Sequence, residues 1–130
     1  IATGLDSARV DLLVAVLERR AGLRLRDRDV YASSVGGLRL AEPAVDLALC
    51  LAVASSRREK PVPRELVALA EVGLAGELRL VGHTQRRLAE AARLGFRGAV
   101  LARAYDGPTF GLRLCRARDL TEALATGLAG

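Results

Sequence analysis

The segment 45–54 constrains the fold more than any other, because Asp46 carries its only polar side chain. Glu42-Pro43 precedes this segment; proline suits the first turn of a helix, and carboxylates there complement the helix dipole. We therefore expect a helix from Pro43 to about Arg58, ended by the prolines that follow. A helix that is apolar on all sides is buried on all sides. The rest of the chain is then expected to enclose this helix.

Three further helices are predicted from the helical spacing of apolar residues and from residues typical of helix ends. Their expected bounds are Thr3 or Asp6-Ser7 to about Ala21 before Gly22, Thr84 as a cap to Gly95 as a terminator, and Leu120 to Ala125 after the capping residue Asp119. About four helices are therefore expected in all.

Strands are predicted where apolar residues alternate or cluster between turn residues. The expected strands are Val30–Val35 and Leu38–Leu40, joined as a hairpin through Gly36-Gly37, then Leu66–Glu71, Glu77–Val81, Phe96–Arg103 and Leu112–Ala117. The helix that starts at Thr84 joins two of these strands as a βαβ-like crossover, and the other connections suggest hairpins. This order predicts an α+β fold with a mixed sheet.

Length and composition indicate one domain with a real core. The chain has 130 residues, of which 51% are hydrophobic, and its apolar runs are too short to cross a membrane. It contains no methionine and starts at Ile1, so we expect it to be cut from a longer protein. Cys50 and Cys115 lie far apart in apolar segments, which favours inert buried thiols over a disulfide framework or a metal site.

The net charge of +5 comes almost entirely from arginine, since Lys60 is the only lysine among 20 basic residues. Guanidinium groups match phosphate oxygens well, which favours a nucleic acid as partner. A coding bias toward arginine accounts for the excess equally well. Four aromatic residues are too few for a platform that stacks bases, so any DNA contact is expected to be with phosphates.

Arg86 and Arg87 stand in the first turn of a predicted helix, where the dipole disfavours cations. Backbone N–H groups and guanidinium groups together make an anion site, which is the sharper interpretation of this placement; a solvated helix start is the plain one. Two further basic groups are candidates for the same role. The candidate DNA contacts are Arg86 and Arg87, then Arg24, Arg26 and Arg28, then Arg57, Arg58 and Lys60.

Three stretches carry a family resemblance: ATGLDSAR at 2–9, GGLRLAEPAVDLA at 36–48 and EVGLAGELR at 71–79. They resemble the C-terminal domain of the RadA (Sms) family of bacterial RecA-like repair and recombination ATPases. That domain is itself similar to the proteolytic domain of Lon. The resemblance implies that residues 1–130 form a single Lon-protease-like domain, with the ribosomal S5 domain 2-like fold.

Lon-type proteases use a Ser/Lys dyad, and the resemblance places Ala44 at the serine position and Arg87 at the lysine position. Alanine offers no nucleophile, and arginine stays protonated near neutral pH, so it is not a general base. Lys60 lies in a charged segment before two prolines, and His83 has no carboxylate beside it in the sequence. A new triad built on His83 is therefore disfavoured. Asp46 and Glu71 are interpreted as capping or turn-bonding carboxylates.

The resemblance further implies a cytoplasmic, hexameric ring that binds DNA during branch migration. It implies ATP, Mg²⁺ and Zn²⁺ only in upstream domains, and this segment has no phosphate-binding P-loop motif of its own. The expected partners are DNA, through its backbone, and further copies of the chain, with no membrane. Two alternatives remain open: an oligomerisation scaffold without DNA contact, and a residual Lon-type serine peptidase.

Overall fold

The computed structural model describes residues 2–3, 7–25, 32–33 and 42–128. At its centre lies a three-stranded parallel sheet in the order β3-β6-β7. Its strands are β3 (Leu66–Leu69), β6 (Gly98–Ala102) and β7 (Arg113–Ala117). The middle strand β6 is buried at every position, as expected for a short run of small and branched apolar residues in a parallel sheet. Strand β3 forms one edge of the sheet.

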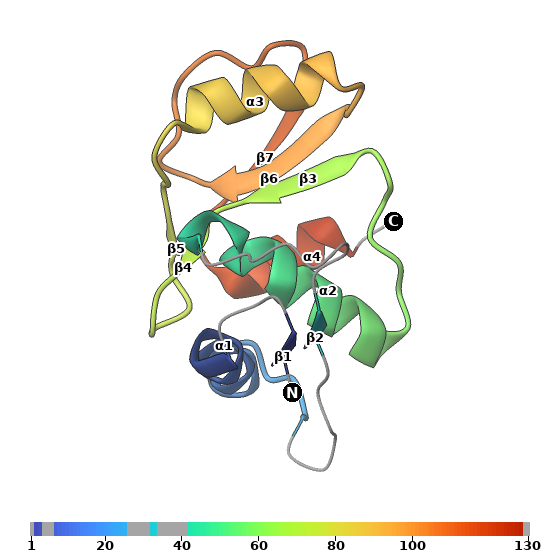
Figure 1. Ribbon diagram of the computed structural model, residues 1–130, viewed down its shortest axis with the longest axis vertical. Helices are drawn as coiled ribbons and strands as arrows, with labels where there is room; N and C mark the ends of the chain where they lie inside the picture. The colour runs from blue at the N-terminus through green and yellow to red at the C-terminus, as the bar shows by residue number, and fades with distance from the viewer. Residues whose placement is uncertain (1, 4–6, 26–31, 34–41, 129–130) are drawn as a thin grey trace.

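One face of the sheet is covered by α3 (Thr84–Arg93) and by the loop between β6 and β7 (Figure 1). Leu88 and Ala91 of α3 pack in one cluster with Ala99 and Leu101 of β6. Tyr105 joins this cluster from the loop, and its hydroxyl group donates to the carbonyl oxygen of Pro108 at 2.6 Å. The face thus has a small core of its own beneath α3.

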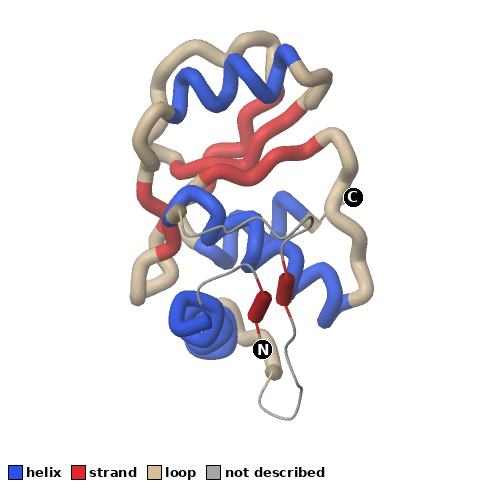
Figure 2. Tube along the Cα trace, viewed as in Figure 1, coloured by secondary structure: helices blue, strands red, loops and turns tan. Residues whose placement is uncertain are grey.

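The opposite face carries the larger core, formed with α1 (Ser7–Arg20), α2 (Asp46–Arg58) and α4 (Leu120–Gly127), as Figure 2 shows. A short 3₁₀ turn, η2 (Pro43–Val45), leads into α2. Fully buried side chains of this core include Leu13, Leu17, Leu47, Leu51, Val100, Leu120 and Leu124. The sheet is therefore a layer between one helix and three.

Two small strand pairs complete the fold. Strands β4 (Glu71–Val72) and β5 (Leu78–Arg79) pair antiparallel, and β1 (Ala2–Thr3) pairs in parallel with β2 (Ala32–Ser33). Parallel and antiparallel pairs occur together, so the predicted α+β class with a mixed sheet is confirmed. The Lon-like assignment stays a prediction.

The helix predictions agree with the structure in position, but α2 was wrongly expected to be buried on all sides. Ala48 and Ala52 are exposed along one side of it. They are small residues four positions apart, so the helix turns a narrow alanine stripe outward while its leucines face the core. Pro43 opens the 3₁₀ turn, as predicted for a first-turn proline.

Two strand predictions need correction, and a third falls mostly outside the described residues. The segment Leu66–Glu71 is not one strand: Ala70 separates β3 from β4, and these belong to different sheets. Strand β7 runs parallel to β6, where a hairpin was expected. Most of the hairpin expected at 30–40 lies outside the described residues, and Ala32–Ser33 pairs with Ala2–Thr3. Within the described ranges, the helices are all too short or too polar to span a membrane.

Candidate functional site

The start of α3 differs in detail from the prediction. His83 is the residue that precedes the helix, in the left-handed conformation with φ of 60°, and its side chain makes no capping hydrogen bond. Thr84 is the first helical residue and does not cap; its hydroxyl group instead donates to the carbonyl oxygen of Val81 at 2.7 Å. Gly95, with φ of +98°, follows the helix as the expected terminator. Arg86 and Arg87 do lie in the first turn, as predicted.

Arg87 is held by two contacts within the chain. Its Nε donates to the carbonyl oxygen of Gly82 at 2.9 Å, and its guanidinium group forms an ion pair with Glu42. Glu42 thereby brings a carboxylate to the amino end of α3, where the dipole favours negative charge. The cation that seemed misplaced in the sequence is thus compensated by a residue 45 positions earlier.

The same ion pair links Arg87 to the segment that holds Ala44, and these are the two positions that the Lon resemblance assigns to a dyad. Glu42 lies two residues before Ala44, which is 5% exposed in η2, and it contacts Arg87 directly. Neither residue offers a nucleophile or a general base. Ala44 instead offers a buried methyl group, and the guanidinium group of Arg87 is neutralised by Glu42.

Arg86 is exposed and has no polar partner among the described residues. It lines an open groove of about 460 Å³ between α3 and β3, which we call the α3–β3 groove. The groove is lined by Val67, Arg86, Arg87, Glu90, Ala91, Leu94 and Phe96. Its floor is apolar and its polar groups are charged side chains of α3.

Glu90 is engaged at the rim of this groove. Arg93 donates two hydrogen bonds to its carboxylate, at 2.9 and 2.5 Å, and these bonds lower the pKa of Glu90 below its ordinary value. Glu90 therefore stays ionised and paired with Arg93, and Arg86 is left as the cation without a partner. Sequence reasoning missed this groove, because it depends on where β3 lies relative to α3.

The second and third basic groups meet in space. Arg57 donates from Nε to the backbone carbonyl oxygen of Arg24 at 2.9 Å, so Arg24, Arg57, Arg58 and Lys60 form one patch at the end of α2. The carbonyl oxygen of Lys60 accepts a hydrogen bond from the Ser55 hydroxyl group. Arg26 and Arg28 lie outside the described residues.

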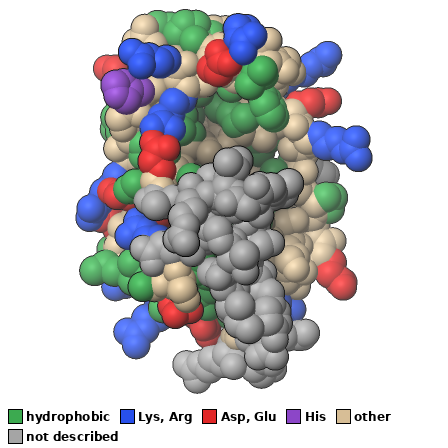
Figure 3. Space-filling view, viewed as in Figure 1, with side chains coloured by type: hydrophobic (Ala, Val, Ile, Leu, Met, Phe, Trp, Pro, Cys, Tyr) green, Lys and Arg blue, Asp and Glu red, His purple; other side chains and the backbone are tan. Residues whose placement is uncertain are grey.

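The two basic sites lie on opposite sides of the sheet. Figure 1 shows the end of α2 far from α3, with the sheet between them. On the face drawn in Figure 3, basic and acidic side chains are interspersed. The structure does not bring the predicted contacts together into one continuous basic surface on the described residues.

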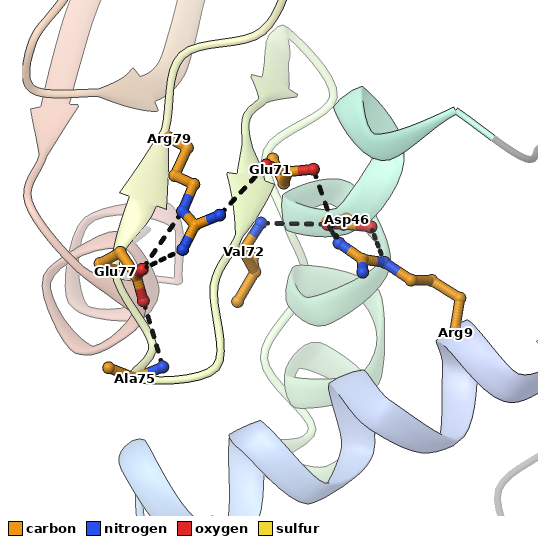
Figure 4. A network of polar contacts seen from close by, with 7 residues as sticks. All are labelled: Arg9, Asp46, Glu71, Val72, Ala75, Glu77 and Arg79. Carbon is orange, nitrogen blue, oxygen red and sulfur yellow. Dashed lines mark hydrogen bonds and ion pairs between the residues drawn. The ribbon is translucent and has the colours of Figure 1, made fainter.

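Asp46 organises a polar network that the sequence interpretation missed (Figure 4). Its side chain is 3% exposed and accepts two hydrogen bonds from Arg9 of α1, including one from Nε at 3.0 Å. It also accepts from the backbone N–H of Val72 in β4 at 3.0 Å. Asp46 therefore joins α1, α2 and β4 and does not cap its own helix, which corrects the predicted role.

Glu71 extends this network toward β5. Its carboxylate lies 4.0 Å from the guanidinium group of Arg9 and 3.9 Å from that of Arg79. Arg79 in turn pairs with Glu77 at 2.7 Å, a contact that lowers the pKa of Glu77. These are structural ion pairs between neighbouring elements, and every carboxylate here has a cationic partner.

The cysteines match the predicted inert role to different degrees. Cys50 is fully buried in α2, and burial, followed by the nearby charge of Asp46, raises the pKa of its thiol to about 12. A thiol with such a pKa is protonated and unreactive at neutral pH. Cys115 lies half-buried in β7 and is likewise free. Over the described ranges, no three His, Cys, Asp or Glu side chains are grouped to hold a metal ion.

Among the described residues, Thr84, Ser55 and Ser56 do not form a catalytic arrangement with His83. The hydroxyl group of Thr84 is directed to Val81, and Ser55 and Ser56 lie in the last turns of α2, across the sheet from α3. Within the described residues, the region around α3 offers an exposed guanidinium group, that of Arg86, and a groove with apolar lining.

Comparison with known proteins places this chain beside one set of relatives. It is 44% identical over 133 residues to DNA repair protein RadA of Bacillus subtilis and 43% identical over 127 residues to that of Salmonella typhimurium. These alignments cover 100% and 96% of this chain but only 29% and 28% of the relatives. Against RadA of Streptococcus pyogenes the identity is 52% over 94 residues, 72% of this chain and 21% of the relative. No protein-family model matches the chain.

Proposed function

Because this chain belongs to the RadA family of DNA repair proteins over the part that it spans, we propose that it is a non-catalytic domain that contacts DNA within a larger repair protein. The proposal covers a Lon-protease-like domain without a working dyad. We further propose that the protein is located in the cytoplasm. Sites for ATP, Mg²⁺ and Zn²⁺ would lie in other parts of the full-length protein.

The observation that carries the DNA contact is the unpaired Arg86 at the amino end of α3. Glu42 neutralises Arg87 and Glu90 is paired with Arg93, so Arg86 is the guanidinium group of this helix that remains available to a phosphate. The N–H groups of the first turn favour an anion at the same place. The net charge of +5 supports weak, sequence-independent attraction to DNA.

Arg86→Gln is expected to weaken DNA binding about threefold at low salt, because one phosphate contact is lost. The slope of log Kd against log salt should fall by about one unit. Fluorescence anisotropy with labelled single-stranded and duplex 20-mers, between 50 and 200 mM salt, measures both quantities. The matched control is Arg93→Gln, which removes the same charge from the same helix at a guanidinium group already paired with Glu90.

Equal effects of the two substitutions would mean that only the overall charge matters, which contradicts a site at Arg86. The patch at the end of α2 is tested in the same way with Arg58→Gln. Charge-neutral variants at Arg86 and at the end of α2 can also be tested in the full-length protein. If they leave DNA affinity unchanged, the domain is better explained as an oligomerisation scaffold without DNA contact.

Assembly into a hexameric ring is the second part of the proposal. Its support is the family membership together with the alanine stripe of Ala48 and Ala52, which leaves small apolar side chains exposed on α2. Such a ring would bring equivalent basic patches together around one axis and so raise the local charge that meets DNA.

The chain is expected to show no peptidase activity. Ala44 lacks a hydroxyl group and Arg87 is held as a cation by Glu42, so the region offers neither partner of a Ser/Lys dyad. Incubation with unfolded casein and with a serine-reactive phosphonate measures cleavage and labelling. Labelling above that of a heat-denatured sample, or cleavage of casein, would restore the peptidase alternative.

A further inference from the structure

The α3–β3 groove runs along an open sheet edge. Strand β3 pairs with β6 on one side only. The carbonyl oxygen of Glu65 accepts from Gly98 at the start of β6, so by strand alternation residues 65, 67 and 69 direct their backbone groups to β6. Ala68 therefore directs its N–H and C=O outward. Neither group has a hydrogen-bond partner among the described residues, and β3 is partly exposed throughout.

The two ends of the groove differ in the chemistry of their side chains. Figure 1 shows α3 starting above the carboxyl end of β3 and running back toward its amino end. Arg86 and Arg87 thus stand at the end of the groove near Leu69, and Leu94 and Phe96 at the other end. Leu94 is 61% exposed, although it is a large apolar side chain. One end of the groove suits a negative group and the rest suits apolar groups.

We propose that this groove binds an extended peptide segment of a partner protein, which adds to β3 as a further strand and carries alternating apolar side chains followed by an acidic one. The backbone of the segment would pair with Ala68, as in other cases where an extended peptide adds to an open sheet edge. Its apolar side chains would cover Val67, Leu94 and Phe96, and its carboxylate would meet Arg86.

The dimensions set the expected pattern of the segment. From Arg86 to Leu94 the chain rises by about 12 Å, at about 1.5 Å per residue, which equals roughly four residues of an extended strand. Side chains two apart on a strand face the same way. The segment should therefore have apolar residues at positions 1 and 3 and an acidic residue at position 5.

A peptide fits this groove better than a nucleic acid does. The floor contains one aromatic ring, that of Phe96, and no polar group that could bond to base edges. The outward N–H and C=O groups of Ala68 match a second backbone with such groups at strand spacing, which a nucleic acid does not offer. The inference does not depend on DNA binding, because a phosphate at Arg86 needs neither Leu94 nor the edge of β3.

Selection from a phage-displayed library of random octapeptides, on the full chain, tests the inference. The expected result is enrichment of the alternating apolar and acidic pattern. A synthetic copy of the enriched peptide should lose at least tenfold in affinity on Leu94→Asp and on Arg86→Glu, measured by isothermal titration. Leu74→Asp is the matched control, since Leu74 is 69% exposed in the turn between β4 and β5 and does not line the groove.

Absence of enrichment, or affinity that is unchanged by Leu94→Asp, would overturn the inference. Tighter binding of the twelve-nucleotide strand (dT)12 than of any peptide, with loss of that binding on Leu94→Asp, would assign the groove to single-stranded DNA instead. Both altered side chains are exposed, so thermal unfolding midpoints should match that of the unaltered chain. N-methylation of the peptide nitrogen that donates to the carbonyl oxygen of Ala68 should abolish binding, while methylation of the next nitrogen along the peptide should not.

Discussion

Asp46→Ala is expected to lower the free energy of unfolding by about 3 kcal/mol or more. The substitution removes the buried carboxylate that accepts from Arg9 and from the N–H of Val72, so both donors lose this acceptor. Breaking a buried ion pair from one side typically costs 3–5 kcal/mol. Urea denaturation followed by circular dichroism measures the change through the midpoint at constant slope.

The control for this prediction is Asp106→Ala, in the exposed loop after β6, which should change stability by less than about 0.5 kcal/mol. Arg9→Ala should be strongly destabilising as well. The double variant should lose less than the sum of the single losses, because the two residues share one interaction. Additive losses would show that Asp46 acts through Val72 and not through Arg9.

Leu88→Ala is expected to cost about 2–5 kcal/mol and to loosen α3 before the rest of the molecule. Leu88 is fully buried and is the largest side chain by which α3 packs on the sheet, where it meets Ala99 and Leu101. The larger core lies on the other face and keeps its contacts. Hydrogen exchange should therefore report faster exchange in α3 than in α2, together with a lower unfolding midpoint.

Leu80→Ala serves as the comparison, since Leu80 is 46% exposed and lies just outside β5. It should have little effect on the midpoint or on exchange in α3. A uniform increase of exchange across all elements in Leu88→Ala would mean that the two cores unfold together. In that case α3 would not be a separately stabilised layer.

The sequence predicted the helices well because their signals are local. Asp119 was expected to cap the last helix, and its carboxylate accepts from the N–H of Glu122 at 2.9 Å. Gly95 ends α3 in the left-handed conformation, as its position suggested. Thr84 was wrongly expected to cap α3, because His83 adopts the left-handed conformation there and the threonine hydroxyl group finds a carbonyl oxygen instead.

Long-range features could not be predicted from local patterns. Strand β7 was expected to return as a hairpin after the turn at 106–108, but the connection, in which Tyr105 packs with α3 and β6, returns the chain in parallel. Parallel neighbours usually need a longer, helical connection, so pattern reasoning favoured the hairpin. The partners of Asp46 are 37 and 26 residues away, which no periodicity indicates.

The candidate site was predicted in part. Sequence reasoning identified Arg86 and Arg87 as unusual for a helix start, and both do lie there. As DNA contacts the two were treated as equivalent, whereas Glu42 forms an ion pair with Arg87 and none with Arg86. The hydrogen bond from Arg57 to the carbonyl oxygen of Arg24 was also not predicted, because it depends on how α2 lies against the segment after α1.

The ion pair between Glu42 and Arg87 has a consequence for any attempt to turn this domain into a hydrolase. Installing a dyad through Ala44→Ser and Arg87→Lys would place the new amine beside the Glu42 carboxylate. An adjacent negative charge stabilises the ammonium form and raises its pKa, whereas a general base must be neutral near pH 7. Such a redesign would therefore require a third change, Glu42→Gln, before the amine could take a proton from the new hydroxyl group.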